Sequence, residues 1–123
     1  MNAPSITTIY DLLEGKQDTV PFSSGQIIFE RDQPGNTMYV IMEGVVDVMV
    51  QDTVINTLGV GEILGEMALV DNRIRSATAV AKADCKLISV DEKQFNFLVQ
   101  HHPSFALSIM RILAERLRKR TES

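Results

Sequence analysis

Glu66 and Arg75 are the two residues whose types and spacing most clearly indicate chemistry, because they lie nine positions apart in one short stretch. The stretch, Gly65–Ala81, reads GEMALVDNRIRSATAVA. A carboxylate can accept hydrogen bonds from a sugar hydroxyl, and a guanidinium can bind two phosphate oxygens at once. Backbone N–H groups beside small residues can bind an anion directly. The stretch therefore predicts a site for a sugar phosphate, although Glu66 and Arg75 taken alone would more simply be interpreted as a structural ion pair with each other.

Composition limits the kind of protein that this chain can be. The 123 residues are 45% apolar and 23% charged, which is ordinary for one globular domain with a hydrophobic core. The net charge of −4 argues against broad nucleic-acid binding. No secretory leader or membrane-spanning run is apparent, and the single cysteine, Cys85, excludes an internal disulfide. We expect one cytoplasmic domain over residues 1–123, with Cys85 as a small buried hydrophobe.

The middle of the chain, from about Val20 to Val90, has the apolar and polar alternation that is typical of β-strands. Turn residues interrupt it at Gln33–Asn36, Glu43-Gly44 and Gly59–Gly61. Many short strands at close spacing favour a mainly β fold, an antiparallel double-stranded β-helix or jelly roll. The predicted strands are Gln26–Glu30, Met38–Glu43, Val45–Gln51, Thr53–Leu58, Ser76–Ala81 and Cys85–Val90.

Helices are predicted at both ends of the sheet core, which occupies about residues 20–90. Ser5 or Thr7 could cap a short N-terminal helix that ends at Gly15. Two C-terminal helices are expected between about residues 91 and 120. Asp91 is a suitable N-cap for the first, over Glu92–Gln100, and Pro103 suits the start of the second, over Ser104–Arg120.

The last predicted helix carries two apolar stripes and a basic end. Phe105, Ile109 and Ile112 form the first stripe, which we expect to pack on the sheet. The second stripe has coiled-coil spacing and predicts packing on a partner helix or over a ligand. Its members are Ala106, Met110, Leu113 and Leu117. The basic end suits the helix dipole and is interpreted as a solvated C-terminus; its residues are Arg116, Arg118, Lys119 and Arg120.

Catalytic and metal-binding patterns are not visible in the sequence. A jelly-roll metalloenzyme such as a cupin would need histidines and carboxylates spaced along the strands. The two histidines, His101 and His102, are adjacent and lie outside the predicted sheet. No Ser-His-Asp or Cys-His arrangement is apparent either. The sequence therefore predicts a sensor without a metal or an enzymatic activity, with a cupin-like enzyme as an alternative that elemental analysis would test.

Two motifs resemble those of the cyclic nucleotide-binding domain family. LGEMAL followed by IRSATAV is similar to the family's phosphate-binding cassette, F-G-E-x-A-L and then P-R-x-A-T-V. Upstream, GQIIFERDQPGNTMYVIMEG is similar to G-x-x-I-F-x-x-G-D-x-G-D-x-M-Y-V-I-x-x-G. The resemblance covers about Pro21 to Arg118. Members of the family include the catabolite activator protein, the regulatory subunits of cAMP-dependent protein kinase and cyclic nucleotide-gated channels.

The resemblance implies a role for each cassette residue. Glu66 would bind the ribose 2′-hydroxyl, and Arg75 would pair with the exocyclic oxygens of the cyclic phosphate. Gly65 and Ala68 would donate backbone N–H groups, and Ser76 would contact the phosphate or a guanine. The complete predicted ligand-binding set is Gly65, Glu66, Met67, Ala68, Arg75, Ser76 and Ala77.

The chain departs from the family pattern at three positions and at its end. Leu64 replaces the common aromatic and Ile74 the common proline, and both substitutions are expected to change only packing. Asp32 replaces a turn glycine; aspartate tolerates a positive φ better than most residues, so the turn should survive. The transcription factors of the family continue into a helix-turn-helix domain after the last helix. No residues remain here for such a domain, so DNA binding is not expected.

The combined expectation is a non-enzymatic sensor that binds a cyclic nucleotide and signals by moving its C-terminal helices. cAMP is the ligand that the resemblance favours, with cGMP as the alternative. The expected partners are a second copy, through the C-terminal helix, and an unidentified effector protein, but no membrane. A different hypothesis is an interaction or dimerisation protein whose cassette has lost its ligand.

Overall fold

We describe a computed structural model of the chain, which places residues 19–70 and 74–122. The N-terminal helix predicted between Ser5 and Gly15 lies outside the described residues. The strands are β1 (Thr19–Phe22), β2 (Ile27–Phe29), β3 (Thr37–Glu43), β4 (Val46–Val50), β5 (Thr53–Leu58), β6 (Ile63–Leu64), β7 (Thr78–Ala81) and β8 (Cys85–Asp91). The helices are α2 (Met67–Val70), α3 (Glu92–His101) and α4 (Pro103–Glu122).

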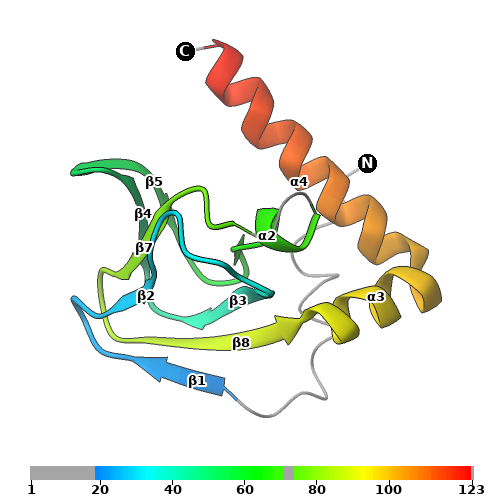
Figure 1. The fold of residues 1–123 in the computed structure, drawn as a ribbon, viewed down its shortest axis with the longest axis horizontal. Coiled ribbons are helices and arrows are strands. Elements are labelled where there is room, and N and C mark those ends of the chain that lie inside the picture. The colour runs from blue at the N-terminus through cyan, green and yellow to red at the C-terminus, as the bar shows by residue number, and fades with distance from the viewer. Residues whose placement is uncertain (1–18, 71–73, 123) are drawn as a thin grey trace.

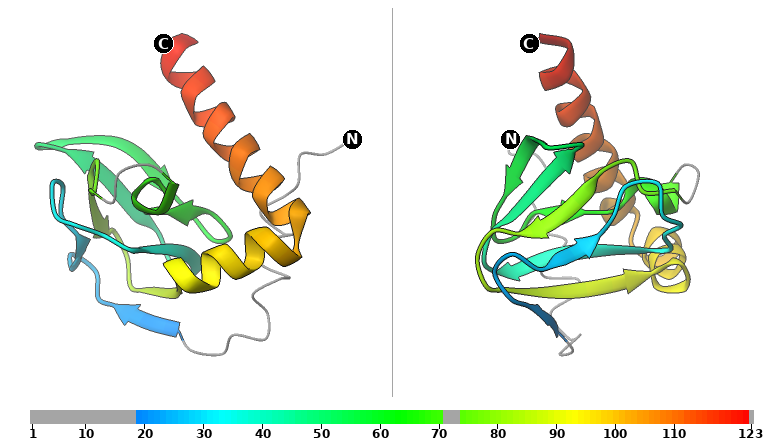
Figure 2. Two further views of the ribbon diagram at one scale, coloured as in Figure 1. Left: turned by 45° about the vertical axis from the view of Figure 1, so that its right-hand side comes forward. Right: turned by 60° about the vertical axis from the view of Figure 1, so that its left-hand side comes forward.

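The strands form two four-stranded sheets, with the orders β1-β8-β3-β6 and β2-β7-β4-β5. Every pairing within the sheets is antiparallel. The sheets lie face to face, and α3 and α4 lie together at one end of them (Figures 1 and 2). This is the jelly-roll fold that the short, closely spaced strands predicted.

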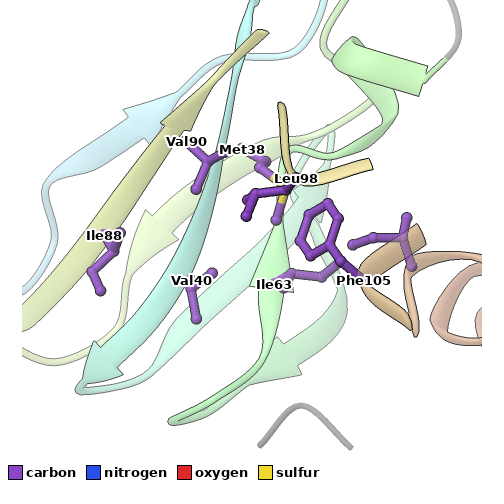
Figure 3. Packing of buried hydrophobic residues seen from close by; sticks show 8 residues of the cluster. Met38, Val40, Ile63, Ile88, Val90, Leu98 and Phe105 are labelled. Atoms are coloured by element: carbon purple, nitrogen blue, oxygen red, sulfur yellow. The ribbon is translucent and has the colours of Figure 1, made fainter. Parts of the chain in front are cut away.

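Two clusters of buried side chains hold the sheets and helices together. One cluster fills the space between the sheets and is built mainly by β3, β4, β7 and β8; it includes Ile41, Val46, Ala79 and Leu87. The other joins the sheet of β3 and β8 to the two C-terminal helices; it includes Met38, Val90, Leu98, Phe105 and Ile109 (Figure 3). Phe105 is fully buried, which anchors the start of α4 against the sheet. The position of α4 is therefore fixed at its N-terminal end by the core.

The predicted strands are found, with small shifts at their ends, but two strands were missed. β1 contains Pro21, which lacks an N–H for the ladder; β1 pairs with β8 alone, so Pro21 occupies an edge strand, where proline is tolerated. β6 is only two residues long, too short to show alternation. The largest shift is in β7, which begins at Thr78 although the prediction began at Ser76.

The two C-terminal helices begin where their capping residues predicted. The Asp91 side chain accepts a hydrogen bond from the Gln94 N–H, and the Gln94 side chain accepts one from the Asp91 N–H, which together form a capping box. Pro103 is the first residue of α4. None of the helices in the described ranges is long and apolar enough to cross a membrane.

The prediction of which residues form the two apolar stripes of the last helix was partly wrong. Phe105, Ile109 and Ile112 pack on the core as expected, but Leu113 also packs against this cluster. Ala106 is half-buried, whereas Met110 and Leu117 are exposed. The exposed apolar face is therefore narrower than predicted, and it also includes Leu107.

Cys85 has the structural role that the sequence suggested. It is 3% exposed and belongs to the cluster between the sheets. Its single S–H is shared between the carbonyl oxygens of Val45 and Ala83, and burial raises the pKa of the thiol. A buried thiol with a raised pKa is a poor nucleophile.

Candidate functional site

The segment that carries the predicted site leaves β6 through Gly65, which turns the chain sharply into α2. Gly65 has a φ of +80°, a conformation that glycine adopts without strain. A Cβ at this position would lie 2.6 Å from Arg75 Nη1 and 3.1 Å from the Thr37 carbonyl oxygen. The glycine therefore serves the backbone turn and also makes room for the guanidinium, which brings the two ends of the segment together.

Arg75 is held in place by both its backbone and its side chain. Its N–H donates to the Gln33 carbonyl, and its own carbonyl accepts from the Asp32 N–H, at 2.8 Å each. The guanidinium lies 4.1 Å from the centroid of the Phe29 ring and donates from Nη1 to the Gly65 carbonyl at 3.0 Å. The residue is 6% exposed. These contacts fix the direction of the guanidinium.

The Arg75 guanidinium carries a positive charge and has N–H donors to spare. Burial lowers the pKa of the guanidinium, and electrostatic interaction with Tyr39 and Glu66 opposes that shift. An arginine keeps its proton in proteins, so the site carries a cation. Gly65 is the one acceptor of the guanidinium among the described residues, which leaves N–H donors for an anion.

The turn at Asp32, between β2 and β3, has the conformation that the sequence predicted. Asp32, which replaces the family's turn glycine, has a φ of 73°. Aspartate is among the few residues with a side chain that visit this region. The backbone bonds that join Asp32 and Gln33 to Arg75 show that the turn survives the substitution.

Glu66 is the other charged group of the site, and it is 4% exposed. Its Oε2 accepts a hydrogen bond and forms an ion pair with Arg116 Nη1 at 3.0 Å. Its Oε1 is buried and has no hydrogen-bond partner among the described residues. Glu66 is thus paired with Arg116, and the structural ion pair with Arg75 that was considered as an alternative does not form.

The remaining predicted site residues belong to the same segment and differ in how far they are exposed to solvent. Met67 begins α2 and is exposed, whereas Ala68 is buried. Of the two predicted backbone donors, Ala68 lies in the first turn of α2, where N–H groups have no partner within the helix. Ser76 is exposed, and Ala77 is buried beside the start of β7.

Arg116 is a site residue that sequence reasoning missed, because it was interpreted as part of a solvated basic end. Its Nη2 also donates to the Ile63 carbonyl at 2.7 Å, so one guanidinium joins α4 to both β6 and Glu66. A signal was present in the sequence. Arg116 follows Ile112 by four residues and therefore continues the buried stripe of Phe105 and Ile109 onto the same helical face.

The site can bind an anion and a hydroxyl group side by side. Arg75 offers charged donors, and Glu66 offers an acceptor oxygen that is already buried. Within the described ranges, no three or more His, Cys, Asp and Glu residues gather in a way that could hold a metal ion.

A comparison with protein families matches residues 19–102 to the model of the cyclic nucleotide-binding domain. The chain belongs to this family. The match spans both sheets, the cassette segment and α3. The expected resemblance is confirmed.

Individual relatives support the same assignment. The chain is 36% identical over 95 residues to the cAMP-dependent protein kinase regulatory subunit of Eremothecium gossypii, covering 77% of this chain and 20% of that one. It superposes on the catabolite activator protein of Thermus thermophilus with a TM-score of 0.81 and 29% identity, covering 90% and 55% of the two chains.

A third relative is itself an enzyme. The EAL enzyme Bd1971 has been solved in a cAMP-bound form, with a TM-score of 0.65 and 35% identity over 85% of this chain and 30% of that one. Its cGMP-bound form gives a TM-score of 0.66 and 36% identity, over 85% and 29%. The chain thus spans between a fifth and about half of the length of these relatives.

Proposed function

We propose that this chain is a non-enzymatic sensor that binds a cyclic purine mononucleotide, cAMP or cGMP, at the Gly65–Ala77 segment. The observation that carries the proposal is Glu66 Oε1, a buried acceptor without a donor, in the same segment as the buried cation Arg75. Leaving a buried polar atom unpaired is costly, so such an atom indicates a missing partner. The relatives support the ligand class, since one is named for cAMP and another was solved with cAMP and with cGMP.

Each chemical group of the ligand has a partner in this arrangement. Arg75 binds the cyclic phosphate, assisted by the backbone N–H groups of Gly65 and Ala68. Glu66 accepts from the 2′-hydroxyl, which is the one free hydroxyl on the sugar of a 3′,5′-cyclic nucleotide. Ser76 and Ala77 extend the site along the chain from Arg75, where the exposed Ser76 hydroxyl can contact the phosphate or a guanine. The choice between cAMP and cGMP thus depends on the base and on Ser76.

A cytoplasmic location is also part of the proposal and depends on the sequence features described in the sequence analysis.

Ligand-induced stabilisation tests this function. A ligand that binds only the folded state at 100 times its Kd adds about 2.7 kcal/mol to the free energy of unfolding. For a domain of this size, that is an increase in Tm of roughly 10 °C or more. We expect cAMP or cGMP to produce it and 5′-AMP to produce much less, because the open phosphate adds a charge and a 3′-hydroxyl. If neither cyclic nucleotide raises Tm at millimolar concentration, the proposed function is wrong.

The response to the ligand is proposed to pass through the C-terminal helices to an effector protein. Arg116 links α4 to Glu66, while Phe105 anchors the start of α4 in the core. A ligand can shift the position of α4 only if it binds one position more tightly than the other. The Arg116 contact supplies a reason for such a difference, since it joins the helix directly to the sugar-binding carboxylate.

The exposed face of α4 supports a homodimer as the partner of this chain. Leu107, Met110, Ala114 and Leu117 repeat at intervals of three and four residues, which is the spacing of paired helices. Met110 is 59% exposed. We expect a dimer in light scattering that becomes a monomer in Met110→Glu, while Gln100→Glu, an exposed substitution on α3, leaves the mass unchanged. A monomeric wild-type chain at 100 μM, or a dimer that survives Met110→Glu, would contradict this interface.

A further inference from the structure

Arg116 connects two parts of the chain that are far apart in the sequence. It lies on α4, 50 residues after Glu66, and its guanidinium donates to Glu66 Oε2 at 3.0 Å and to the Ile63 carbonyl at 2.7 Å. The side chain of Arg116 is 28% exposed, whereas that of Glu66 is 5% exposed. The pair is therefore largely shielded from water on the carboxylate side, where charged hydrogen bonds are strongest.

The place of Arg116 follows from the way α4 packs. Phe105 and Ile109 are buried on the face of α4 that meets the sheet, and Ile112 packs against the same cluster. Arg116 stands one turn further along that face, so its guanidinium reaches β6 and Glu66 only while α4 lies in this position. Figure 1 shows the C-terminal end of α4 extending beyond the sheets. The contact of Arg116 with Glu66 and Ile63 therefore depends on the position of α4.

The two oxygens of Glu66 have different roles. Oε2 is occupied by Arg116, while Oε1 is buried and has no partner among the described residues. A carboxylate can accept through both oxygens at once, so the bond to Arg116 does not exclude a second donor. It does fix the plane of the carboxylate, which decides where Oε1 points.

We propose that Arg116 is a positioning residue for sugar recognition, which holds Glu66 by one oxygen so that the other is presented to the ligand hydroxyl. This inference rests on the proposed function and deepens it. Recognition of the 2′-hydroxyl then depends on the position of α4. By thermodynamic linkage, binding of the hydroxyl stabilises that position of α4 to the same extent.

A purely structural role for Arg116 is the alternative. In that case, the bonds to Glu66 and Ile63 would only fasten α4 to the sheet. Removing them would then weaken all nucleotides equally, because the hydroxyl would have no special part. The two roles differ in whether the loss depends on the presence of the 2′-hydroxyl.

The test is the affinity of cAMP and of 2′-deoxy-cAMP for the wild-type chain, Arg116→Ala and Arg118→Ala. Arg118 is the matched control, since it lies on the same helix and forms an exposed ion pair with Glu115. We expect Arg116→Ala to weaken cAMP about tenfold and 2′-deoxy-cAMP less than threefold, and Arg118→Ala to change neither. Equal losses for both nucleotides, or no loss for cAMP, would overturn the inference.

Two further results separate this inference from the proposed function. If the wild-type chain binds neither nucleotide, the proposed function fails and the inference with it; if it binds both but Arg116→Ala shows equal losses, only the inference fails.

Arg116→Lys provides a variant that keeps the charge if the alanine variant does not fold. Lysine cannot donate in a fork to Glu66 and Ile63 together, so we expect a smaller loss, again confined to cAMP. A loss shared by 2′-deoxy-cAMP would contradict the positioning role.

Discussion

Replacing Arg75 with alanine is expected to weaken cAMP binding about 10- to 100-fold. Charged hydrogen bonds contribute roughly 1.5–3 kcal/mol each, and 1.4 kcal/mol corresponds to a factor of ten in affinity. Arg75 is 6% exposed and lies 4.1 Å from the centroid of the Phe29 ring, so its guanidinium is held in place before any ligand arrives. Little entropy is therefore lost when it binds the phosphate. Isothermal titration calorimetry measures the change directly.

Two further variants show whether the loss of cAMP affinity is due to removal of the Arg75 guanidinium. Arg75→Lys keeps the charge but loses the fork and the stacking on Phe29, so an intermediate affinity is expected. Arg111→Ala removes an exposed arginine from α4 and is expected to bind cAMP like the wild type. Circular dichroism would check that each variant is folded. A folded Arg75→Ala variant with the affinity of the wild type would exclude Arg75 from the binding site.

The Gly35→Ala variant is expected to lose about as much affinity as Arg75→Ala, although it adds only one methyl group. A Cβ on Gly35 would overlap Nε and Cζ of Arg75 and lie 2.9 Å from its Cδ. The backbone at Gly35 does not have a positive φ, so alanine fits the local conformation. The flexible arginine must therefore move away. We expect the fold to survive while the guanidinium leaves the phosphate position, with a loss of at least tenfold in calorimetry.

A double variant and a second glycine give this prediction its controls. If Gly35→Ala acts through Arg75, then Gly35→Ala combined with Arg75→Ala should bind no more weakly than Arg75→Ala alone. Gly59→Ala is the matched control, because its Cβ would meet only Glu62 Oε2, at 3.9 Å. Additive losses in the double variant would mean that Gly35 acts by another route.

Most of the fold could be predicted from the sequence because the local signals and the packing agree. Thr53–Leu58 and the start of α3 at Glu92 were placed correctly, since turn residues and the Asp91 cap mark their ends. The prediction failed where local patterns were weak. The two residues of β6 are strand only because they pair with Tyr39 and Val40, a long-range contact that no local pattern reveals.

The candidate site was predicted in part for the same reason. Glu66 and Arg75 were found because they lie in one motif, and both are buried in the structure. Arg116 was missed, because its role depends on a helix crossing a segment 50 residues away. Its place on the stripe of Phe105 was visible, but four basic residues close to the C-terminus were more simply interpreted as solvated. Side-chain pairing between distant elements was thus the information that the sequence lacked.

The contacts of Arg116 change how the site is understood. The cassette segment supplies the groups that would bind the phosphate and the sugar, and α4 supplies a group that holds one of them. Binding and helix position are then parts of one equilibrium. The ligand would then act on α4, the helix that would contact an effector, directly through Glu66 and Arg116.

Calorimetric titration of the wild-type chain with cAMP, run beside Arg75→Ala, shows whether the Gly65–Ala77 segment is a nucleotide site. We expect one cAMP per chain for the wild type and an affinity at least tenfold weaker for the variant. The contradicting result is a wild-type chain that gives no binding heat with cAMP or cGMP at any temperature tried, or equal heats and affinities for the two proteins.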